Sequence, residues 1–485
     1  MLFNSFEFLL FFPIVTIIYF LLPNKVRWFH LLVASCVFYM AFIPIYILIL
    51  FITIIIDYIA GIMIENSNGA SRKAYLVMSI IANVGVLAIF KYYNFLAFNI
   101  DHALHLANAG GHIPLLRIIL PIGLSFHTFQ AMSYTIEVYR GNQKAERHIG
   151  IYALYVMFYP QLVAGPIERP QNLLHQFHEY HAFDYDNAVS GLRQMMWGML
   201  KKVVIADRLD MVVDTVYNDP RHNSGIGLAI ATVLFAFQIF ADFSGYSDIA
   251  IGAARVMGFK LMTNFNNPYH AKSISEFWRR WHISLSTWFN DYLFTPLTIS
   301  FRNLGLYAVM LAAIITFLTS GLWHGAAWKY IAWGGLHGLA IAYETLTKKK
   351  RKKIFKRISP AVGNIIGTVC TFTYVCFSYV FFRAHNLNDA FYIISKICLI
   401  PGEAMHILAI KKIAFLNLPA LYILGICFLL IGLMELALYV AEKTQLTVTF
   451  AKKPIYLRWA LYYAGPIIIY YFGVFEKHEF IYFQF

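Results

Sequence analysis

Long apolar segments recur along this chain, and they restrict its fold more than any other feature. Each holds about 20 residues, enough for a helix to cross a hydrocarbon layer of about 30 Å. Lipid offers the backbone no hydrogen-bond partners, so helices that pair internally are expected. We predict an all-α, multi-pass membrane protein with about 10 to 12 transmembrane helices plus interfacial and re-entrant helices, forming one membrane-embedded domain over residues 1–485. The expected spans lie near 7–22, 30–56, 75–98, 114–136, 150–166, 190–206, 226–256, 304–320, 326–346, 361–382, 416–440 and 459–475.

Charged residues are sparse and unevenly placed. Only 13% of residues are charged, 59% are hydrophobic, and the formal net charge is +14. Membrane proteins collect Lys and Arg in cytoplasmic segments, so this charge does not indicate nucleic-acid binding. The stretch KKKRKKIFKR at 348–357 is the most basic, and we predict that it is cytoplasmic and contacts anionic membrane lipids. Counting spans from this stretch places the C-terminal tail, 476–485, outside.

The stretch SISEFWRRWHISLSTWFNDYL at 273–293 predicts one amphipathic helix at the membrane interface, because its apolar residues follow a helical spacing. Ser273 and Glu276 have the spacing of a capping box, and Glu276 and Arg280 have that of a favourable ion pair. An interfacial helix explains everything here except His282, at the edge of the apolar stripe. A lone histidine in such a place is more often structural than functional, and both interpretations stay open at this point.

The stretch GLWHGAAWKYIAWGGLHG at 321–338 places two histidines among glycines and apolar residues. The glycines predict close helix packing or a broken helix. An ionisable residue inside a membrane is expensive and faces the protein interior or a water-filled cavity. A neutral histidine is the least expensive of them and exchanges a proton near pH 7. His324 is therefore a candidate functional residue, whereas His337 cannot share a face of one straight helix with it and is the weaker candidate.

Two acidic residues, Asp242 and Asp248, lie in the apolar run 236–259. Asp248 and Arg255 fall on nearly the same helix face, so a buried structural ion pair is the favoured interpretation. The cysteines show no metal-type spacing, and neither a metal site nor a disulfide framework is expected. The sequence contains no nucleophile elbow, P-loop, zinc-protease motif or dinucleotide-binding motif. Any chemistry therefore rests on histidine and on substrate positioning.

Six long motifs are spread through almost the whole chain. They are LPIGLSFHTFQAMSY (120–134), YPQLVAGPIERP (159–170), FADFSGYSDIAIG (240–252), EFWRRWHISLSTWFNDYLFTPL (276–297), GLWHGAAWKYIAWGGLHG (321–338) and FIYFQF (480–485). Together, and in this order, they resemble the membrane-bound O-acyltransferase family, in its bacterial branch that acetylates polysaccharides such as alginate. The resemblance places the family's active-site histidine on His324 and its second signature polar position on His282.

This resemblance implies a cytoplasmic thioester donor, most simply acetyl-CoA, and an extracytoplasmic polysaccharide acceptor, in a bacterial inner membrane. His324 is expected to be the general base, and His282 to orient the donor or polarise its carbonyl. No cofactor besides the donor substrate is expected. The alternatives are transfer of D-alanine to teichoic acid and, from another class, a glycan or lipid transporter. Further residues expected to shape the cavity or bind the donor are Trp278, Trp281, Trp323, Asp242 and Asp248.

The tail EKHEFIYFQF is aromatic where most chain ends are polar. Anchoring at the membrane interface is the simpler interpretation, because Tyr and Phe are stable there. The sharper interpretation is a relay. The phenol of Tyr482 accepts the acetyl group near His324 and passes it to an extracytoplasmic, esterase-like partner acetyltransferase. The sequence leaves both interpretations open.

Overall fold

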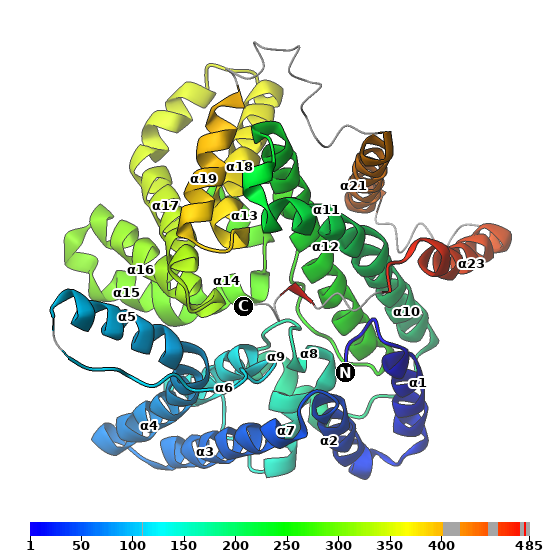
Figure 1. Cartoon of the computed structure of the whole chain (residues 1–485). Coiled ribbons are helices and arrows are strands. Elements are labelled where there is room, and N and C mark those ends of the chain that lie inside the picture. The colour runs from blue at the N-terminus through cyan, green and yellow to red at the C-terminus, as the bar shows by residue number, and fades with distance from the viewer. Residues whose placement is uncertain (109, 401–417, 445–453, 476–479, 482–485) are drawn as a thin grey trace. The chain divides into compact units, whose positions relative to one another are not determined.

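The computed structural model describes residues 1–485 except 109, 401–417, 445–453, 476–479 and 482–485 (Figure 1). Every regular element among the described residues is a helix, so the all-α prediction is confirmed. Contacts divide the chain into two compact units. The first unit is Met1–Met195 with Ser247–Thr263, and the second is Met196–Tyr246 with Asn264–Phe485. Each unit is described separately, and a single domain over the whole chain stays a prediction.

The first unit is built mainly from the N-terminal helices. Two helices, α10 (Tyr185–Met199) and α12 (Gly225–Val256), contribute residues to both units. The other helices of the first unit are α1 (Phe6–Leu21), α2 (Asn24–Met40), α3 (Ile47–Asn66), α4 (Gly69–Leu87), α5 (Tyr93–Leu106), α6 (Leu124–Arg140), α7 (Ile149–Met157), α8 (Tyr159–Leu162) and α9 (Pro170–Leu173).

The second unit holds the remaining helices, including those that carry both candidate histidines. They are α11 (Asp207–Asn218), α13 (Ile274–Arg280), α14 (Ile283–Phe289), α15 (Thr295–Ser300), α16 (Leu306–His324), α17 (Trp328–Phe355), α18 (Pro360–Arg383), α19 (Leu387–Cys398), α21 (Leu418–Thr444) and α23 (Ile455–Phe472). A π-helical segment, Leu200–Ala206, joins α10 to α11.

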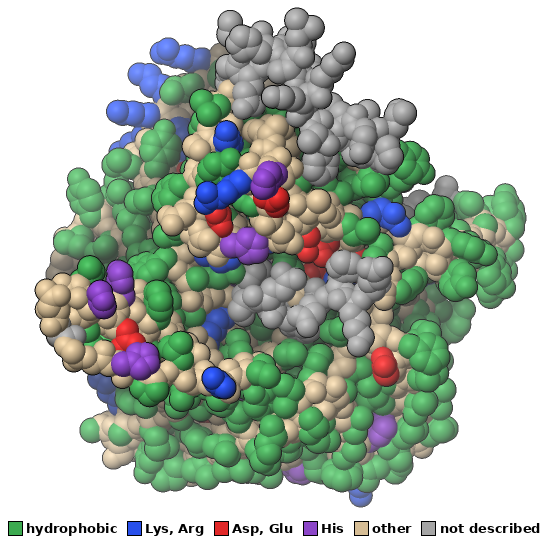
Figure 2. Space-filling model, in the orientation of Figure 1, with side chains coloured by type: hydrophobic (Ala, Val, Ile, Leu, Met, Phe, Trp, Pro, Cys, Tyr) green, Lys and Arg blue, Asp and Glu red, His purple; other side chains and the backbone are tan. Residues whose placement is uncertain are grey.

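Among the described residues, six helical stretches are long and apolar enough to cross a membrane. Hydrophobic side chains cover most of the face drawn in Figure 2, and a group of Lys and Arg side chains gathers at its upper left. Such an apolar exterior suits lipid rather than water. The six stretches are Pro44–Asn66, Gly69–Leu106, Gly225–Val256, Leu306–His324, Pro360–Arg383 and Tyr422–Lys443.

Three of the expected spans are interrupted. The span predicted at 30–56 is divided between α2, which ends at Met40, and α3, which begins at Ile47 after a turn at Pro44. Residues 114–121 of the span predicted at 114–136 are not helical, and α6 begins only after Gly123, whose φ is 77°. Pro121 disfavours helical geometry in the residue before it, and the left-handed backbone of Gly123 delays the start of α6 to Leu124. The span predicted at 150–166 is divided into α7 and the short α8, which begins beside Pro160. Prolines and left-handed glycines thus shorten helices that hydropathy alone extends.

Polar side chains join spanning helices inside the first unit. The carboxylate of Asp57 on α3 is 0% exposed and accepts hydrogen bonds from Ser79 Oγ (2.6 Å) and Asn83 Nδ2 (2.9 Å) of α4. The Ser79 hydroxyl also lies 3.0 Å from Thr135 Oγ1 of α6. A buried carboxylate is tolerated only where such partners satisfy it. These contacts therefore fix α3, α4 and α6 against one another.

Glycines let α16 and α17 approach closely in the second unit. A Cβ added at Gly321 would lie 2.2 Å from the Tyr330 carbonyl oxygen, and one at Gly334 would lie 2.1 Å from the Phe317 carbonyl oxygen. No side chain larger than hydrogen fits at such separations. Helix α16 also ends at His324, and α17 begins at Trp328. Close packing and a break, the two outcomes predicted for this glycine-rich stretch, both occur.

Replacing Gly334 with Ala is expected to destabilise the protein by about 1–3 kcal/mol, because the new methyl group would overlap a backbone carbonyl that cannot move alone. Gly335→Ala is the matched control, since its Cβ would meet only Leu318 Cδ2 at an ordinary 3.5 Å. Thermal unfolding of both purified variants in detergent measures the difference. Equal midpoints for the two variants would contradict the backbone contact between α16 and α17.

Candidate functional site

His324 is the last residue of α16, and it is 4% exposed. Its ring is surrounded by aromatic rings from three helices. The centroid distances are 4.9 Å to Trp323 of α16, 5.0 Å to Trp333 of α17 and 5.5 Å to Phe382 of α18. His324 thus faces the protein interior, where neighbouring rings restrict the approach of water.

His282 lies at a break between two helices, and the prediction of one continuous helix over 273–293 is wrong. Helix α13 ends at Arg280 and α14 begins at Ile283. His282 connects them with φ 43° and ψ 55°, a left-handed conformation that a residue with a Cβ rarely adopts. The ring is 0% exposed. Apolar spacing continues across the break, so periodicity alone does not reveal it.

The start of α13 has the capping arrangement that the sequence predicts. Ser273 Oγ accepts a hydrogen bond from the Glu276 amide at 3.1 Å. Glu276 reaches back and accepts one from the Lys272 amide at 3.0 Å, and it pairs with Arg280 at 2.9 Å. The capping box and the ion pair are both confirmed, with the return bond made one residue before the cap.

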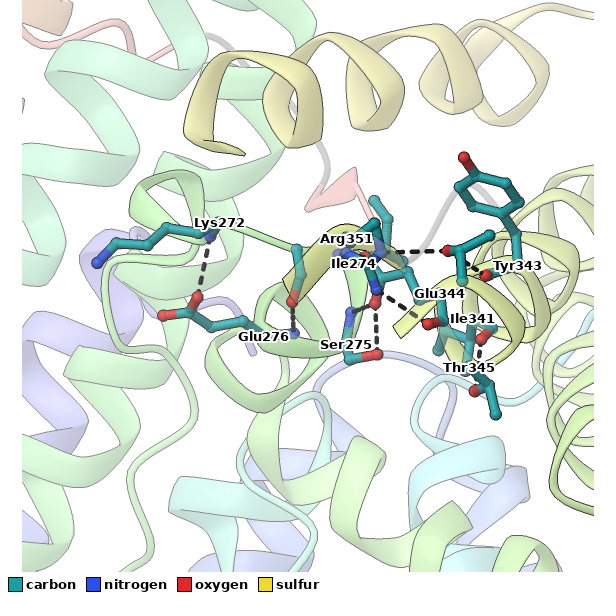
Figure 3. A network of polar contacts seen from close by, with 11 residues as sticks. Lys272, Ile274, Ser275, Glu276, Ile341, Tyr343, Glu344, Thr345 and Arg351 are labelled. Carbon is teal, nitrogen blue, oxygen red and sulfur yellow. Dashed lines mark hydrogen bonds and ion pairs between the residues drawn. The ribbon is translucent and has the colours of Figure 1, made fainter. Parts of the chain in front are cut away.

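Glu344 of α17 fastens the start of α13 from the side (Figure 3). Its two carboxylate oxygens accept hydrogen bonds from the Ile274 amide at 2.7 Å and the Ser275 amide at 3.0 Å. Arg351 donates to the Glu344 carbonyl oxygen at 3.0 Å. Helix α17 continues through the basic stretch as far as Phe355. The start of α13 is therefore held beside the basic end of α17.

A series of ring contacts connects the two histidines with the C-terminal segment inside the second unit. His282 lies 6.4 Å from Trp323, which lies 4.9 Å from His324. On its other side, His282 lies 4.6 Å from Phe243 of α12. Phe243 in turn lies 5.7 Å from Phe480, which is 2% exposed. The structure thus brings together both candidate histidines, Trp323 and the described part of the tail.

Asp242 joins a buried cation to this tail. Its carboxylate is 2.8 Å from Lys202 Nζ, and Lys202 is also 2.7 Å from Asp207. The other Asp242 oxygen accepts a hydrogen bond from the Ile481 amide at 2.9 Å. The next residue, Tyr482, lies outside the described residues. Asp242 therefore anchors the chain immediately before Tyr482.

The cavity or donor-binding roles expected of the remaining sequence candidates stay predictions. Trp281 packs against other rings, among them Phe265 at 5.1 Å. Asp248 belongs to the first unit, where its carboxylate accepts a hydrogen bond from Gln194 at 2.8 Å. Its pairing with Arg255 also stays a prediction.

Trp278 and His337 belong to a continuous hydrogen-bond chain in the second unit. The Trp278 indole N–H donates to His337 Nδ1 at 3.2 Å. An indole nitrogen only donates, so His337 Nδ1 accepts and Nε2 carries the hydrogen. That hydrogen is donated to Ser378 Oγ at 3.0 Å, and Ser378 donates to the Val375 carbonyl at 2.8 Å. Both nitrogens of His337 are thus engaged, which favours a structural role.

A cavity of about 600 Å³ lies beside α13, α14 and α16. Thr316 and Ser320 line it, and His324 follows them at steps of four residues on one face of α16. This face therefore leads from the cavity towards His324. Other residues that line it are Ser275, Trp278, Arg279, Ile283, Ser286 and Phe317.

Sequence reasoning missed two residues of the site. Lys202 had a usable signal, because a lysine within the apolar run 190–206 is expensive and must find a partner. Asn264 had none. It lies 18 positions before His282, and its Oδ1 reaches His282 Nδ1 at 3.1 Å only in the folded chain.

Comparisons with known proteins point to one family. A model of the membrane-bound O-acyltransferase family matches residues 143–383. A probable alginate O-acetylase of Pseudomonas aeruginosa is 38% identical, over 80% of this chain and 73% of that protein. A peptidoglycan O-acetyltransferase of Helicobacter pylori is 33% identical, over 80% and 76%. A teichoic acid D-alanyltransferase of Bacillus subtilis is 29% identical, over 56% and 70%.

Ser378→Ala tests the hydrogen-bond chain from Trp278 through His337 to Ser378. Removing the hydroxyl leaves the buried Nε2–H of His337 without its acceptor, which is expected to lower stability by about 1–3 kcal/mol. Thr319→Ala is the control, because that exposed hydroxyl bonds to the Ile315 carbonyl of its own helix. Thermal unfolding in detergent compares the two variants. A Ser378→Ala protein as stable as the control would contradict the hydrogen bond from His337 to Ser378.

Proposed function

The chain belongs to the membrane-bound O-acyltransferase family and is an acyltransferase, and we propose that it transfers acetyl groups across a bacterial inner membrane to modify an extracytoplasmic polysaccharide. Acetyl is favoured over D-alanine because the O-acetyltransferase relatives match more of the chain at higher identity. Family membership also favours an enzyme over a transporter. The observation that carries the proposal is the series of ring contacts that joins His324 and His282 to the C-terminal segment.

In the proposed reaction His324 is the general base. A hydroxyl oxygen attacks the carbonyl carbon of the acetyl thioester, and His324 takes the hydroxyl proton as the new C–O bond forms. The C–S bond then breaks, and the leaving thiolate takes the proton from His324. The products are an acetyl ester and a free thiol, so atoms and charge balance. A thioester is reactive enough that no serine nucleophile is required.

The donor is proposed to be acetyl-CoA, entering through the cavity beside α13, α14 and α16. Arg279 and Ser275 line this cavity, and α13 is held beside the basic end of α17. If that basic stretch is cytoplasmic, as the excess of Lys and Arg predicts, the end of the cavity at Ser275 and the donor are on the same side. The face of α16 with Thr316 and Ser320 then leads the thioester towards His324.

The first acceptor is proposed to be the Tyr482 phenol. Phe480 and Ile481 are 2% and 3% exposed, so the chain just before Tyr482 is buried in the second unit rather than spread at a membrane interface. Phe480 packs on Phe243, which packs on His282. Tyr482 would accept the acetyl group from the thioester and release it outside to an esterase-like partner acetyltransferase, which esterifies the polysaccharide.

His324→Ala is expected to reduce acetyl transfer by at least about a hundredfold, because general-base catalysis contributes about 10²–10⁴ in rate. Transfer from radiolabelled acetyl-CoA by the purified protein, and acetyl content of the polysaccharide in cells, are the measurements. His175→Ala is a suitable control, since His175 is 56% exposed. Wild-type transfer by His324→Ala at normal abundance would refute the role of His324 as general base.

Tyr482→Phe separates relay from anchoring, because it keeps the ring and removes only the hydroxyl. We expect polysaccharide acetylation to be lost at normal membrane abundance, and mass spectrometry to find an acetyl ester on Tyr482 when the partner is deleted. Phe480→Ala is expected to reduce transfer by loosening the tail, whereas Phe475→Ala, at a residue 57% exposed, is the control. An active Tyr482→Phe protein without a Tyr482 ester would leave only an aromatic anchor.

A further inference from the structure

Asn264 organises the turn that carries His282. It is 1% exposed, and its side-chain oxygen accepts three hydrogen bonds. They come from the Ser284 amide at 3.2 Å, the Ser284 hydroxyl at 2.9 Å and His282 Nδ1 at 3.1 Å. The Asn264 carbonyl also accepts from the Ile283 amide at 2.8 Å. One asparagine thus holds both the left-handed backbone and the ring of His282.

These contacts determine which nitrogen of His282 carries the hydrogen. A peptide N–H only donates, so the Asn264 atom that faces the Ser284 amide is the oxygen rather than the nitrogen. An amide oxygen only accepts, so His282 Nδ1 must donate to it. Burial lowers the pKa of His282 to about 3, which keeps the ring neutral. A neutral imidazole has one N–H, and the lone pair of His282 therefore lies on Nε2.

The hydrogen-bond partners of His337 hold that ring in the other tautomer, with the hydrogen on Nε2. Its Nδ1 accepts from the Trp278 indole, and its Nε2 carries the hydrogen. His282 and His337 are thus held as opposite tautomers by different partners. A ring with its lone pair on Nε2 cannot donate from that atom to a thioester carbonyl oxygen. Two roles were predicted for His282. Polarisation of the carbonyl is therefore disfavoured, and orientation of the donor is the role that remains.

We propose that Asn264 is a positioning residue that holds His282 Nε2 as an acceptor for an amide N–H of the acyl donor, and so selects thioesters whose thiol arm carries an amide close to the sulfur. This inference rests on the proposed function, in which the attacking hydroxyl gives its proton to His324. His282 immediately precedes α14, and Ile283 and Ser286 of that helix line the cavity assigned to the donor.

Trp323 sets a condition on this contact. The His282 ring is 0% exposed, and Trp323 contacts both His282 at 6.4 Å and His324 at 4.9 Å. The Trp323 indole must therefore turn aside when the thioester enters between the two histidines. The amide N–H would then meet Nε2 of His282, while the carbonyl carbon would lie before the hydroxyl that His324 deprotonates. The hydrogen bond to the amide fixes the position of the thiol arm of the donor. No covalent bond forms or breaks at this contact.

The test compares two small acetyl thioesters on the purified full-length protein. S,N-diacetylcysteamine carries an amide two carbons from the sulfur, and S-acetylpentanethiol has a similar length without the amide. The wild type is expected to use the amide-bearing donor about tenfold better in kcat/KM, the value of one well-formed hydrogen bond. Asn264→Leu is expected to bring this ratio close to one, chiefly through KM for the amide-bearing donor. Asn264→Asp, which keeps an oxygen acceptor, is expected to retain the preference.

Asn266→Leu is the matched control, because Asn266 is exposed and donates its backbone N–H, which the substitution keeps, to the Arg280 carbonyl at 2.9 Å. The ratio is measured within one sample, so it does not depend on how much protein folds. An equal fall for both thioesters in Asn264→Leu, or no preference in the wild type, would overturn the positioning role while leaving the proposed function in place. A wild-type protein that transfers acetyl from neither thioester nor acetyl-CoA would refute the proposed function itself.

Discussion

The close contact between α16 and α17 is the constraint on which the site of the second unit depends. Backbone atoms of one helix occupy the space that a side chain would need at Gly321 and Gly334. The chain then turns back between His324 and Trp328, and Trp333 of α17 comes within 5.0 Å of the His324 ring. A histidine at the end of a tightly packed helix pair has less freedom than one in a loop. Precise positioning of this kind is what proton transfer requires.

Hydrogen bonds fix the orientation of the buried polar side chains. In an apolar interior each polar contact is strong, and each missing one costs free energy. Lys202 lies between the carboxylates of Asp207 and Asp242, and Asp242 also holds the Ile481 amide. Asn264 and Trp278 hold two buried histidines as opposite tautomers. Each buried polar group therefore determines the orientation of the next. The chemical roles proposed for the histidines depend on these partners rather than on their position in the sequence.

Local features of the sequence predicted the local structure well. Contacts between segments that are distant in the sequence could not be predicted from it. Apolar run length predicted helices long enough to cross a membrane, although 10 to 12 were expected and the described residues hold six such stretches. Ser273 and Glu276 predicted a cap, and the glycines near His324 predicted close packing. The break at His282 was missed because its cause, Asn264, lies in a different segment and becomes a neighbour only on folding. Prolines explain the interrupted spans, and their positions were available in the sequence. The pairing of histidines with particular aromatic rings required the structure.

The aromatic surroundings of the histidines bear on which hydroxyl can react there. A polysaccharide that entered would bring many hydroxyl groups into an apolar interior, and each one left without a partner would cost about 1–3 kcal/mol. A tyrosine on an aromatic tail brings a single hydroxyl together with a ring that favours such surroundings. Phe480 and Ile481 already occupy the second unit, with Phe480 separated from His282 by the ring of Phe243. For the proposed function, this argument favours acetylation of the tail inside the protein, with the glycan meeting the acetyl group only outside, where its other hydroxyls stay hydrated.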